Sequence, residues 1–303
     1  MSIVVGVDVG GSGLRCVVVR DGIRDEVHSA PGIRIGSGGV SLPALVETVR
    51  GFLPGEQVDA LTFAARSFTT LADPDEMLAA VVGLGAARSV LCADAISSLV
   101  GALGAVRPGA VVAAGTGAIA FGTDFAGVHR RVDGWGHVLG DRGSAAWLGA
   151  ESLRRLLVAV DLGHSTGGLL SAACAHFGPV MNWSRQVMTR DDAPALLGAF
   201  APRVTALVDD DPLAAALCRE AGALLAGTLL AAAAHLPPDA VLSGTGGLLT
   251  SDAVREPFET AVAAAGRRLT PPVGGSLDGA LVLAEAVASG AAPAPFPPYL
   301  MLG

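Results

Sequence analysis

The chain has 303 residues, of which 51% are hydrophobic, and this length is more typical of two domains than of one. Its formal net charge of −8, with arginines scattered along the chain, argues against binding to a nucleic-acid backbone. All 20 basic residues are arginine, and the absence of lysine excludes P-loop enzymes, protein kinases and pyridoxal enzymes, which each need one.

The chain begins with a predicted β-hairpin. The apolar run Ile3–Val9 passes through the turn Gly10-Gly11-Ser12-Gly13 into a second apolar run, Leu14–Val19. Such a turn directs successive backbone N–H groups inward, where they suit phosphate oxygens. Asp8 lies beside the turn and could hold Mg²⁺ through water. An ordinary hairpin without a ligand explains the same residues, and this alternative stays open.

Strands and helices then alternate. The pattern predicts a strand over 24–29, a flexible loop over 32–39, a helix over 42–52, a strand over 59–65, a helix over 74–85 and a strand over 89–93. Asp94 follows the last of these strands and precedes a helix over 95–103. Its carboxylate should therefore lie at the C-terminal edge of a sheet, where open α/β folds bind ligands. The alternative is a simple helix cap.

The opening pattern recurs after Arg107-Pro108-Gly109. The residues 110–121 again predict strand, glycine turn and strand, with Gly115-Thr116-Gly117 as the turn. A repeat at this separation suits a duplicated domain, with two phosphate-binding turns that face each other across a cleft.

The stretch 134–149 has the composition of a binding loop. Its four glycines at 134, 136, 140 and 143 allow sharp turns and close approach to a ligand, and Trp135 and Trp147 offer rigid walls. His137 and Asp141 add polar groups. Ser144 should cap a helix, whose positive dipole end is expected to keep the Asp141 carboxylate ionised. A glycine-rich crossover with a tryptophan that fills the core is the alternative.

The remainder is mostly helical. Helices are predicted over 144–160, 168–177, 192–208, 213–235, 251–265 and 277–289, with Asp209-Asp210-Asp211-Pro212 as a turn and N-cap. A strand over 240–243 runs into a third glycine turn, Gly244–Gly247, and Gly274-Gly275-Ser276 opens the last helix. The Pro-rich tail from Ala292 is expected to pack over the rest of the protein without regular secondary structure.

Other features indicate a cytoplasmic protein without a structural metal. The four cysteines, Cys16, Cys92, Cys174 and Cys218, are far apart and predict buried reduced thiols. No secretory leader is recognised, and the longest uncharged apolar stretch, 221–236, is shorter than the roughly 20 residues of a membrane span.

The ordered motifs Asp8–Gly13, Asp94, Gly115–Gly117, 134–147 and Gly244–Gly247 together resemble a known family. The chain is similar to the N-acetylglucosamine kinase branch of the sugar-kinase, actin and heat-shock chaperone superfamily. This branch is grouped with dehydratase activators in the BadF/BadG/BcrA/BcrD ATPase family. The resemblance covers nearly the whole chain, and its most specific part is Gly-Trp-Gly-His-x-x-Gly-Asp-x-Gly-Ser-Ala at 134–145.

The resemblance implies an α/β fold with two ribonuclease H-like (actin-like ATPase) domains that flank a nucleotide and sugar cleft. We expect the domains at 1–107 and 108–303, with the last helix and tail, about 285–303, as candidates to pack back on the N-terminal domain. The implied activity is transfer of the γ-phosphate of ATP to a hydroxyl, the 6-hydroxyl as first choice, of N-acetylglucosamine or a related amino sugar. Mg²⁺ is the implied cofactor, and a homodimer is left open.

The resemblance also implies roles for individual residues. Asp94 becomes the base that receives the proton of the sugar hydroxyl, and Asp8 the Mg²⁺ residue. Because phosphoryl transfer is catalysed mainly by positioning and charge neutralisation, an Asp of ordinary pKa suffices. The ATP-binding positions are Gly10, Gly11, Ser12, Gly13, Gly115, Thr116, Gly117, Gly244, Gly246 and Gly247. The sugar-binding positions are Asp94, Gly134, Trp135, Asp141, Arg34 and Ser37.

The departures from the family pattern lie on the sugar side. The loop 31–38 lacks the Asn usual in N-acetylglucosamine kinases, and Arg34 or Ser37 stands in for it. Ala118 replaces the usual Ser or Asn, and Ala64-Ala65-Arg66-Ser67 lacks the expected glycines. Changes among hydroxyl-binding groups alter which sugar is accepted. Two other functions stay open on the same fold: the ATPase activator of a 2-hydroxyacyl-CoA dehydratase, and a sugar sensor without catalysis.

Overall fold

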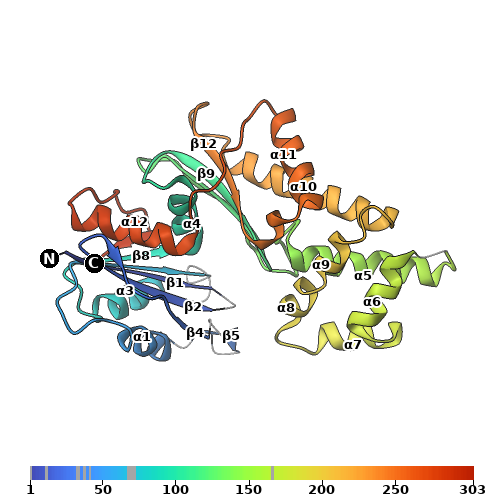
Figure 1. The fold of residues 1–303 in the computed structure, drawn as a ribbon, viewed down its shortest axis with the longest axis horizontal. Helices are drawn as coiled ribbons and strands as arrows, with labels where there is room; N and C mark the ends of the chain where they lie inside the picture. Colours follow the sequence, from blue (N-terminus) through green and yellow to red (C-terminus); the bar gives the residue numbers. More distant parts are fainter. Residues whose placement is uncertain are drawn as a thin grey trace.

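The computed structural model describes residues 2–10, 13–31, 35–36, 39–40, 42–66, 73–164 and 167–303 (Figure 1). Its first sheet has the strand order β13-β8-β7-β1-β2-β3, with β4 also paired to β2. These strands are β1 (Ile3–Val9), β2 (Leu14–Arg20), β3 (Ile23–Arg24), β4 (His28–Ala30), β7 (Ala60–Ala65), β8 (Ser89–Ala93) and β13 (Leu300–Leu302). A separate hairpin joins β5 (Ile35–Gly36) to β6 (Gly39–Val40).

The centre of the first sheet is parallel. The strands β1, β7 and β8 run in the same direction, and every residue of all three is buried. Their near-continuous apolar sequences are what strands covered on both faces require. Helices α1 (Leu42–Arg50) and α3 (Pro74–Val82) lie on one face, while α4 (Asp94–Leu103) and α12 (Ser276–Ala288) cover the other (Figure 1). The carboxyl ends of the three parallel strands therefore meet at one edge.

The second sheet has four strands in the order β11-β10-β9-β12. These are β9 (Gly109–Ala114), β10 (Ala118–Thr123), β11 (His129–Asp133) and β12 (Val241–Thr245). The pair β9–β10 is the second predicted hairpin, and β12 joins β9 in parallel. The second and third glycine turns therefore lie side by side, because each follows one of two adjacent parallel strands.

Helices make up most of the second part of the molecule. They are α5 (Ala145–Asp161), α6 (Gly168–Phe177), η1 (Val180–Asn182), α7 (Trp183–Met188), α8 (Ala193–Gly198), α9 (Ala201–Thr205), α10 (Pro212–Ala232), η2 (Gly247–Thr250) and α11 (Asp252–Ala264). Two predicted caps are confirmed: the Ser144 side chain accepts from the Trp147 amide, and Asp211 accepts from the amides of Leu213 and Ala214.

Three predicted elements differ from the structure. The strand expected over 24–29 is divided into β3 and β4, which pair with opposite ends of β2 and leave 25–27 exposed between them. The helix expected over 192–208 is divided into α8 and α9, and Pro202 lies in the first turn of the second, because a proline has no N–H for the interior of a helix. The Pro-rich tail ends in strand β13, which pairs with β8.

The C-terminal segment belongs physically to the first sheet. Helix α12 packs on β1 and β7, and apolar side chains of α12 and β13 join the core around that sheet. Between them, Phe296 stacks on His129 of β11 with ring centroids 3.7 Å apart, so the tail also contacts the second sheet. We propose that the domain that begins at residue 1 also includes the C-terminal segment, from α12 to residue 303.

Among the described helices, α10 has a length and apolar composition that could cross a membrane, but half of the apolar window is buried inside the protein. It packs against α11, β9 and β10. These contacts are those of a core helix.

Candidate active site

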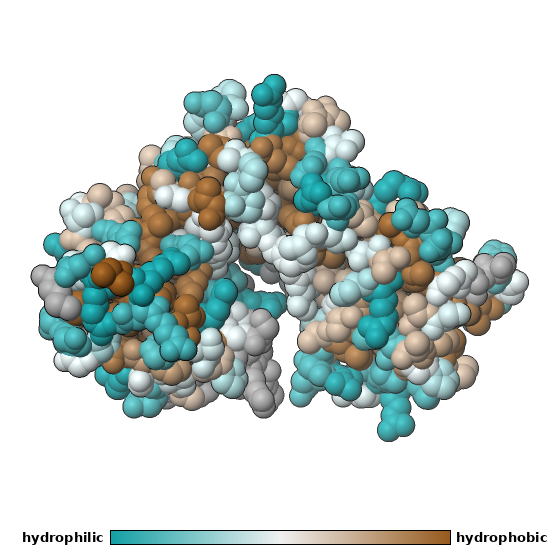
Figure 2. Space-filling view, in the orientation of Figure 1, coloured by the Kyte–Doolittle hydropathy of each residue, from teal (hydrophilic) through white to brown (hydrophobic). Residues whose placement is uncertain are grey.

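Two acidic side chains meet at the carboxyl edge of the first sheet. Asp8 is the penultimate residue of β1, and Asp94 follows β8 as the first residue of α4. Both line a cavity of about 440 Å³, together with Gly10, Gly13, Arg15, Ser98 and Ser276. The molecule is hollowed between its two parts, and the residues around this hollow are mostly neutral or hydrophilic (Figure 2).

Asp8 is held from two sides. It is only 6% exposed, and its Oδ1 accepts a hydrogen bond from the hydroxyl of Ser276 at 2.7 Å. Its Oδ2 pairs with the guanidinium of Arg15, its direct partner across the β1–β2 ladder. Neither partner was assigned from the sequence. The antiparallel pairing of the predicted hairpin could have revealed Arg15 as the residue opposite Asp8, but no local signal connects Ser276 to Asp8.

The first glycine turn is only partly described. The amide of Gly10 donates to the carbonyl of Gly13 at 2.9 Å, which closes the turn between β1 and β2. Gly11 and Ser12 lie outside the described residues, and so do Arg34 and Ser37.

Burial changes the acidity of Asp94. Its surroundings disfavour the charged form, and this desolvation, opposed by Arg66 and reinforced by Asp8, raises the pKa of Asp94 to about 6. The reaction expected from the sequence needs only an Asp of ordinary pKa, and burial raises the pKa of this one above that value. The helix-cap alternative is not supported, because the N-cap of α4 is Ala93 and no side chain caps this helix end.

Two arginines act on Asp94 from different elements. Arg66 directly follows β7, and Arg131 lies in β11 of the second sheet. The positive charge of each lowers the pKa of Asp94, against the effect of burial. The sequence offered a signal for Arg66, since it occupies the same place after its strand as Asp94 does after β8.

The second glycine turn is fixed to the start of α5. The carbonyls of Gly115 and Thr116 accept from the amides of Ala145 and Ala146 at 3.0 and 3.1 Å. A Cβ atom on Gly117 would lie 2.6 Å from Oδ2 of Asp141, which leaves room for glycine alone. The predicted binding loop and the second turn are therefore in direct contact.

The loop 134–143 is built on a residue that the sequence reasoning missed. Asp133 ends β11 and is buried, and its carboxylate accepts from the amides of Asp141 at 2.7 Å and Arg142 at 2.9 Å. Asp133 and Asp141 both have positive φ, 62° and 54°, which is uncommon outside glycine. This acid directly before the Gly-Trp-Gly sequence could have marked the anchor of the loop.

The Asp141 carboxylate lies inside this loop. It is 5% exposed and accepts from the amide of Gly136 at 3.2 Å. Burial raises the pKa of Asp141, and the hydrogen bond from Gly136 only partly opposes this effect. Desolvation is therefore the largest influence on the acidity of Asp141, and the expectation that its carboxylate is ionised stays a prediction.

The two tryptophans of the loop have different environments. Trp135 is 62% exposed, and the guanidinium of Arg131 lies 4.1 Å from the centre of its ring. Arg131 also donates to the carbonyl of Gly134 at 2.6 Å, so it holds the start of the loop. Trp147 instead packs against the core of the second part. Trp135 can wall a ligand. Trp147 is only partly buried, and its role beside a ligand stays a prediction.

Packing accounts for two glycines of the third turn. Gly246 has φ 107°, and a Cβ atom there would lie 2.3 Å from the carbonyl oxygen of Ala114. A Cβ atom on Gly244 would press against Leu249 and Phe258, whereas Gly247 has open space around it. This turn is thus held tightly against the end of β9, beside the second turn.

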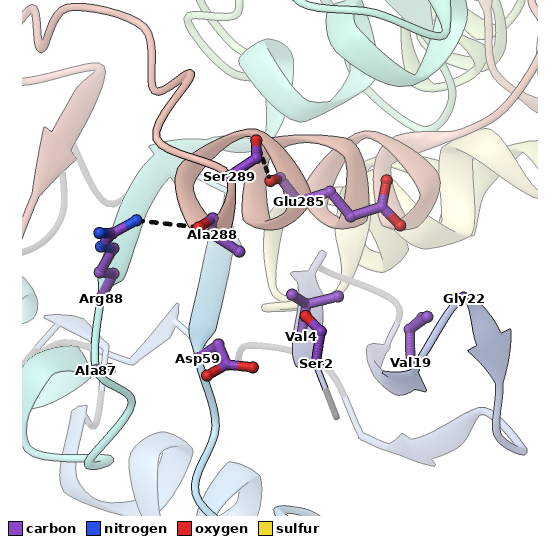
Figure 3. A pocket seen from close by; sticks show the side chains of 10 residues that line it. All are labelled: Ser2, Val4, Val19, Gly22, Asp59, Ala87, Arg88, Glu285, Ala288 and Ser289. Atoms are coloured by element: carbon purple, nitrogen blue, oxygen red, sulfur yellow. Dashed lines mark hydrogen bonds between the residues drawn. The ribbon is translucent and has the colours of Figure 1, made fainter.

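A larger cavity, of about 540 Å³, lies at the opposite edge of the first sheet. It is lined by Ser2 and Val4 at the start of β1, and by Asp59, Arg88 and Glu285 (Figure 3). Arg88 donates to the carbonyls of Val287 and Ala288, and Asp59 accepts from the amide of Ile3. These polar groups are engaged with the backbone, far along β1 from Asp8.

The cysteines do not suggest a metal cluster. Cys16, Cys92 and Cys218 are buried, and burial raises the pKa of the Cys16 thiol to about 12 and that of Cys218 to about 11. Within the described ranges, no group of three or more His, Cys, Asp or Glu side chains could hold a metal ion.

Comparison with known proteins assigns these motifs to one family. The model of the BadF/BadG/BcrA/BcrD ATPase family matches residues 5–281. An N-acetylmuramic acid/N-acetylglucosamine kinase of Clostridium acetobutylicum is 38% identical over 55 residues, which is 18% of this chain and 18% of that kinase. The match to that curated relative thus spans less than a fifth of its length.

Solved structures extend the similarity over the whole fold. A protein from Chromobacterium violaceum assigned as an N-acetylglucosamine kinase is 27% identical, with a TM-score of 0.75, and the match covers 93% of this chain and 98% of that one. A glucokinase from Streptomyces griseus is 18% identical, with a TM-score of 0.58 over 94% and 99% of the two chains. Together with the two sheets, these similarities confirm the predicted α/β class with two ribonuclease H-like parts.

Proposed function

The chain belongs to the BadF/BadG/BcrA/BcrD ATPase family, and we propose that it is an ATP-dependent kinase of N-acetylglucosamine or a related amino sugar. The main support is the cavity that holds Asp8 and Asp94 together at the carboxyl edge of the first sheet. The Chromobacterium violaceum protein, similar over nearly its whole length, supports the kinase class and the amino sugar. The 6-hydroxyl is the acceptor that we infer.

Asp94 is the base of this reaction. A sugar hydroxyl attacks the γ-phosphorus of ATP, and its new oxygen–phosphorus bond replaces the bond to the oxygen between the β- and γ-phosphorus atoms. The hydroxyl proton passes to Asp94, and ADP leaves. A pKa of about 6 makes Asp94 a stronger base than an ordinary Asp while it stays mostly ionised at neutral pH.

Backbone amides are proposed to meet charge on the phosphates, and one carboxylate is proposed to hold the Mg²⁺ that would neutralise the rest. Gly10–Gly13 and Gly115–Gly117 are the proposed phosphate turns, and Gly244–Gly247 is proposed to approach the adenosine. Asp8 fits Mg²⁺ held through water, because Mg²⁺ takes one or two carboxylates and completes its shell with water and phosphate oxygens. When bound, Mg²⁺ neutralises charge on the phosphates of the nucleotide.

The sugar is proposed to bind against the loop 134–143. Asp141 accepts hydrogen bonds from sugar hydroxyls, Gly134 brings the backbone close to the sugar, and Trp135 covers one face of the ring. Arg34 and Ser37 are proposed to contact the N-acetyl group. A cytoplasmic location is proposed as well, since all four cysteines are free thiols.

The pH dependence of the reaction should report the raised pKa of Asp94. The base must be deprotonated, so kcat/KM for the sugar should be constant above pH 7. As the pH drops through about 6, the logarithm of kcat/KM should fall with a slope of one against pH. The measurement is initial ADP release at saturating Mg²⁺ and ATP, with circular dichroism to verify folding at each pH. An acid limb centred near pH 4 would contradict the raised pKa.

Replacement of Asp141 should mainly weaken sugar binding. Asp141→Ala removes a buried acceptor of hydroxyl hydrogen bonds, so the KM for the sugar should rise about ten- to hundredfold while the KM for ATP stays within twofold. Asp124→Ala is the control, because Asp124 also accepts hydrogen bonds from loop amides but follows β10 at the opposite end of the second sheet from Asp133, which anchors the loop of Asp141. An unchanged sugar KM in Asp141→Ala would remove Asp141 from the sugar site.

The proposed function is tested by ADP release from ATP and Mg²⁺ over a panel of sugars. The panel is N-acetylglucosamine, glucosamine, N-acetylmannosamine, N-acetylmuramic acid and glucose, and nuclear magnetic resonance of the product identifies the phosphorylated hydroxyl. Sugar-dependent release supports the kinase and names its substrate. Nucleotide binding without ADP release for any sugar would favour the sugar sensor. A brown colour of the protein purified under anaerobic conditions would favour the dehydratase activator.

A further inference from the structure

The carboxylate of Asp8 is oriented by a residue from the far end of the chain. Ser276 is the first residue of α12, 268 positions after Asp8, and its Oγ donates to Asp8 Oδ1 at 2.7 Å. Ser276 also lines the cavity with Asp8 and Asp94. This contact is not explained by helix capping, since the first turn of α12 is capped by Asp278, which accepts from the amide of Gly275 at 2.7 Å.

A second hydroxyl extends this contact to the helix that carries Asp94. Ser97 Oγ lies 2.6 Å from Ser276 Oγ and 3.0 Å from the carbonyl oxygen of Asp94. A carboxylate can only accept, so the one proton of Ser276 is given to Asp8. Ser97 has one proton of its own, which it shares between Ser276 Oγ and the carbonyl oxygen of Asp94, because a carbonyl oxygen can only accept. Two hydroxyls thus connect the end of β1 to the first turn of α4.

The backbone around Ser276 holds its hydroxyl in place. Asp278 also pairs with Arg24 of β3 at 2.6 Å. One turn further along α12, Gly279 lies so close to α4 that an added Cβ atom would be 1.8 Å from the carbonyl oxygen of Ser97. Ser276 therefore approaches Asp8 from a helix end that cannot move without displacing α4.

Arg15, the other partner of Asp8, differs in this respect. Its side chain is 52% exposed, on a long stem at the rim of the cavity. The pair therefore joins a half-exposed guanidinium to a buried carboxylate, and only the guanidinium can move out into water. The guanidinium can leave Asp8 when a cation binds, whereas the Ser276 hydroxyl stays.

We propose that Ser276 is a positioning residue, which fixes the orientation of the Asp8 carboxylate toward bound Mg²⁺ and couples it, through Ser97, to the helix that begins at Asp94. The role of Asp8 toward Mg²⁺ rests on the proposed function. The hydroxyl itself has no contact with sugar or nucleotide in this assignment.

The test compares Ser276→Ala and Ser276→Thr with the wild-type protein. Calorimetric titration with ADP over a series of Mg²⁺ concentrations measures binding without turnover. In Ser276→Ala, the Mg²⁺ concentration at which the ADP affinity reaches half of its maximum should rise about tenfold. The reason is the loss of the hydrogen bond from the Ser276 hydroxyl to the charged carboxylate of Asp8. The kcat should fall about tenfold with the KM for the sugar unchanged, and Ser276→Thr, which keeps the hydroxyl, should restore both quantities to within threefold.

Ser289→Ala is the matched control, since Ser289 ends the same helix and its hydroxyl donates only to carbonyls of α12. An unchanged Mg²⁺ dependence in folded Ser276→Ala overturns the inference. Equal losses in Ser276→Ala and Ser276→Thr also overturn it, because they would show a packing defect. Absence of sugar phosphorylation by the wild-type protein would count against the proposed function alone, since the ADP titration still decides the role of Ser276.

Discussion

Asp94→Asn should lower kcat for sugar phosphorylation by about a thousandfold while the protein stays folded and binds ADP normally. An amide has nearly the shape of a carboxyl group and can still contact a hydroxyl, but it cannot take up the proton. The pKa of Asp94 is raised to about 6 because its charged form is poorly solvated in the folded protein. Removal of that charge should therefore leave the thermal midpoint unchanged or raise it at neutral pH.

The measurement is ADP release in a coupled assay, together with calorimetry for ADP and a thermal unfolding curve. Asp94→Glu is the companion variant, because it keeps a base but displaces the carboxylate by one methylene. It should retain more activity than Asp94→Asn, and only Asp94→Glu should keep an acid limb in its pH profile. Activity of Asp94→Asn within tenfold of wild type would show that another group takes the proton.

The second large effect concerns the contact between α4 and α12. Gly279→Ala should destabilise the protein by about 3 kcal/mol, at the upper end of what overpacking usually costs. The new Cβ atom would lie 1.8 Å from the carbonyl oxygen of Ser97 and 2.5 Å from the amide nitrogen of Gly101. Both are backbone atoms of α4, so no side chain can rotate away. The two helices must separate, and Asp94 and Ser276 separate with them.

Gly227→Ala is the matched control for this prediction. Gly227 also lies inside a helix, α10, but an added Cβ atom there meets nothing within 4 Å. This variant should be unchanged or more stable by about 0.5–1 kcal/mol, because alanine loses less backbone entropy in a helix. The comparison is the midpoint of denaturant unfolding. Equal midpoints for Gly279→Ala and wild type would show that α4 and α12 leave room for a Cβ atom at position 279.

The sequence alone could predict what depends on near neighbours in the chain. The two hairpins follow from apolar strands on either side of glycine turns, and the caps at Ser144 and Asp211 follow from side chains that bond amides two or three residues away. Asp94 could be placed at a sheet edge for the same reason, because a strand ends directly before it. The family followed from the order of these local motifs.

The partners and the acidity of these groups depended on the tertiary structure. Ser276 reaches Asp8 across 268 residues, and Asp133 holds a loop whose shape no local pattern specifies. Burial removes water from Asp94 and from Asp141 and raises the pKa of both. Burial is a property of the assembled chain. Likewise β13 forms only because β8 offers a free edge to the tail. Local sequence determined which groups are present, and long-range packing decided which of them meet and how strongly each holds its proton.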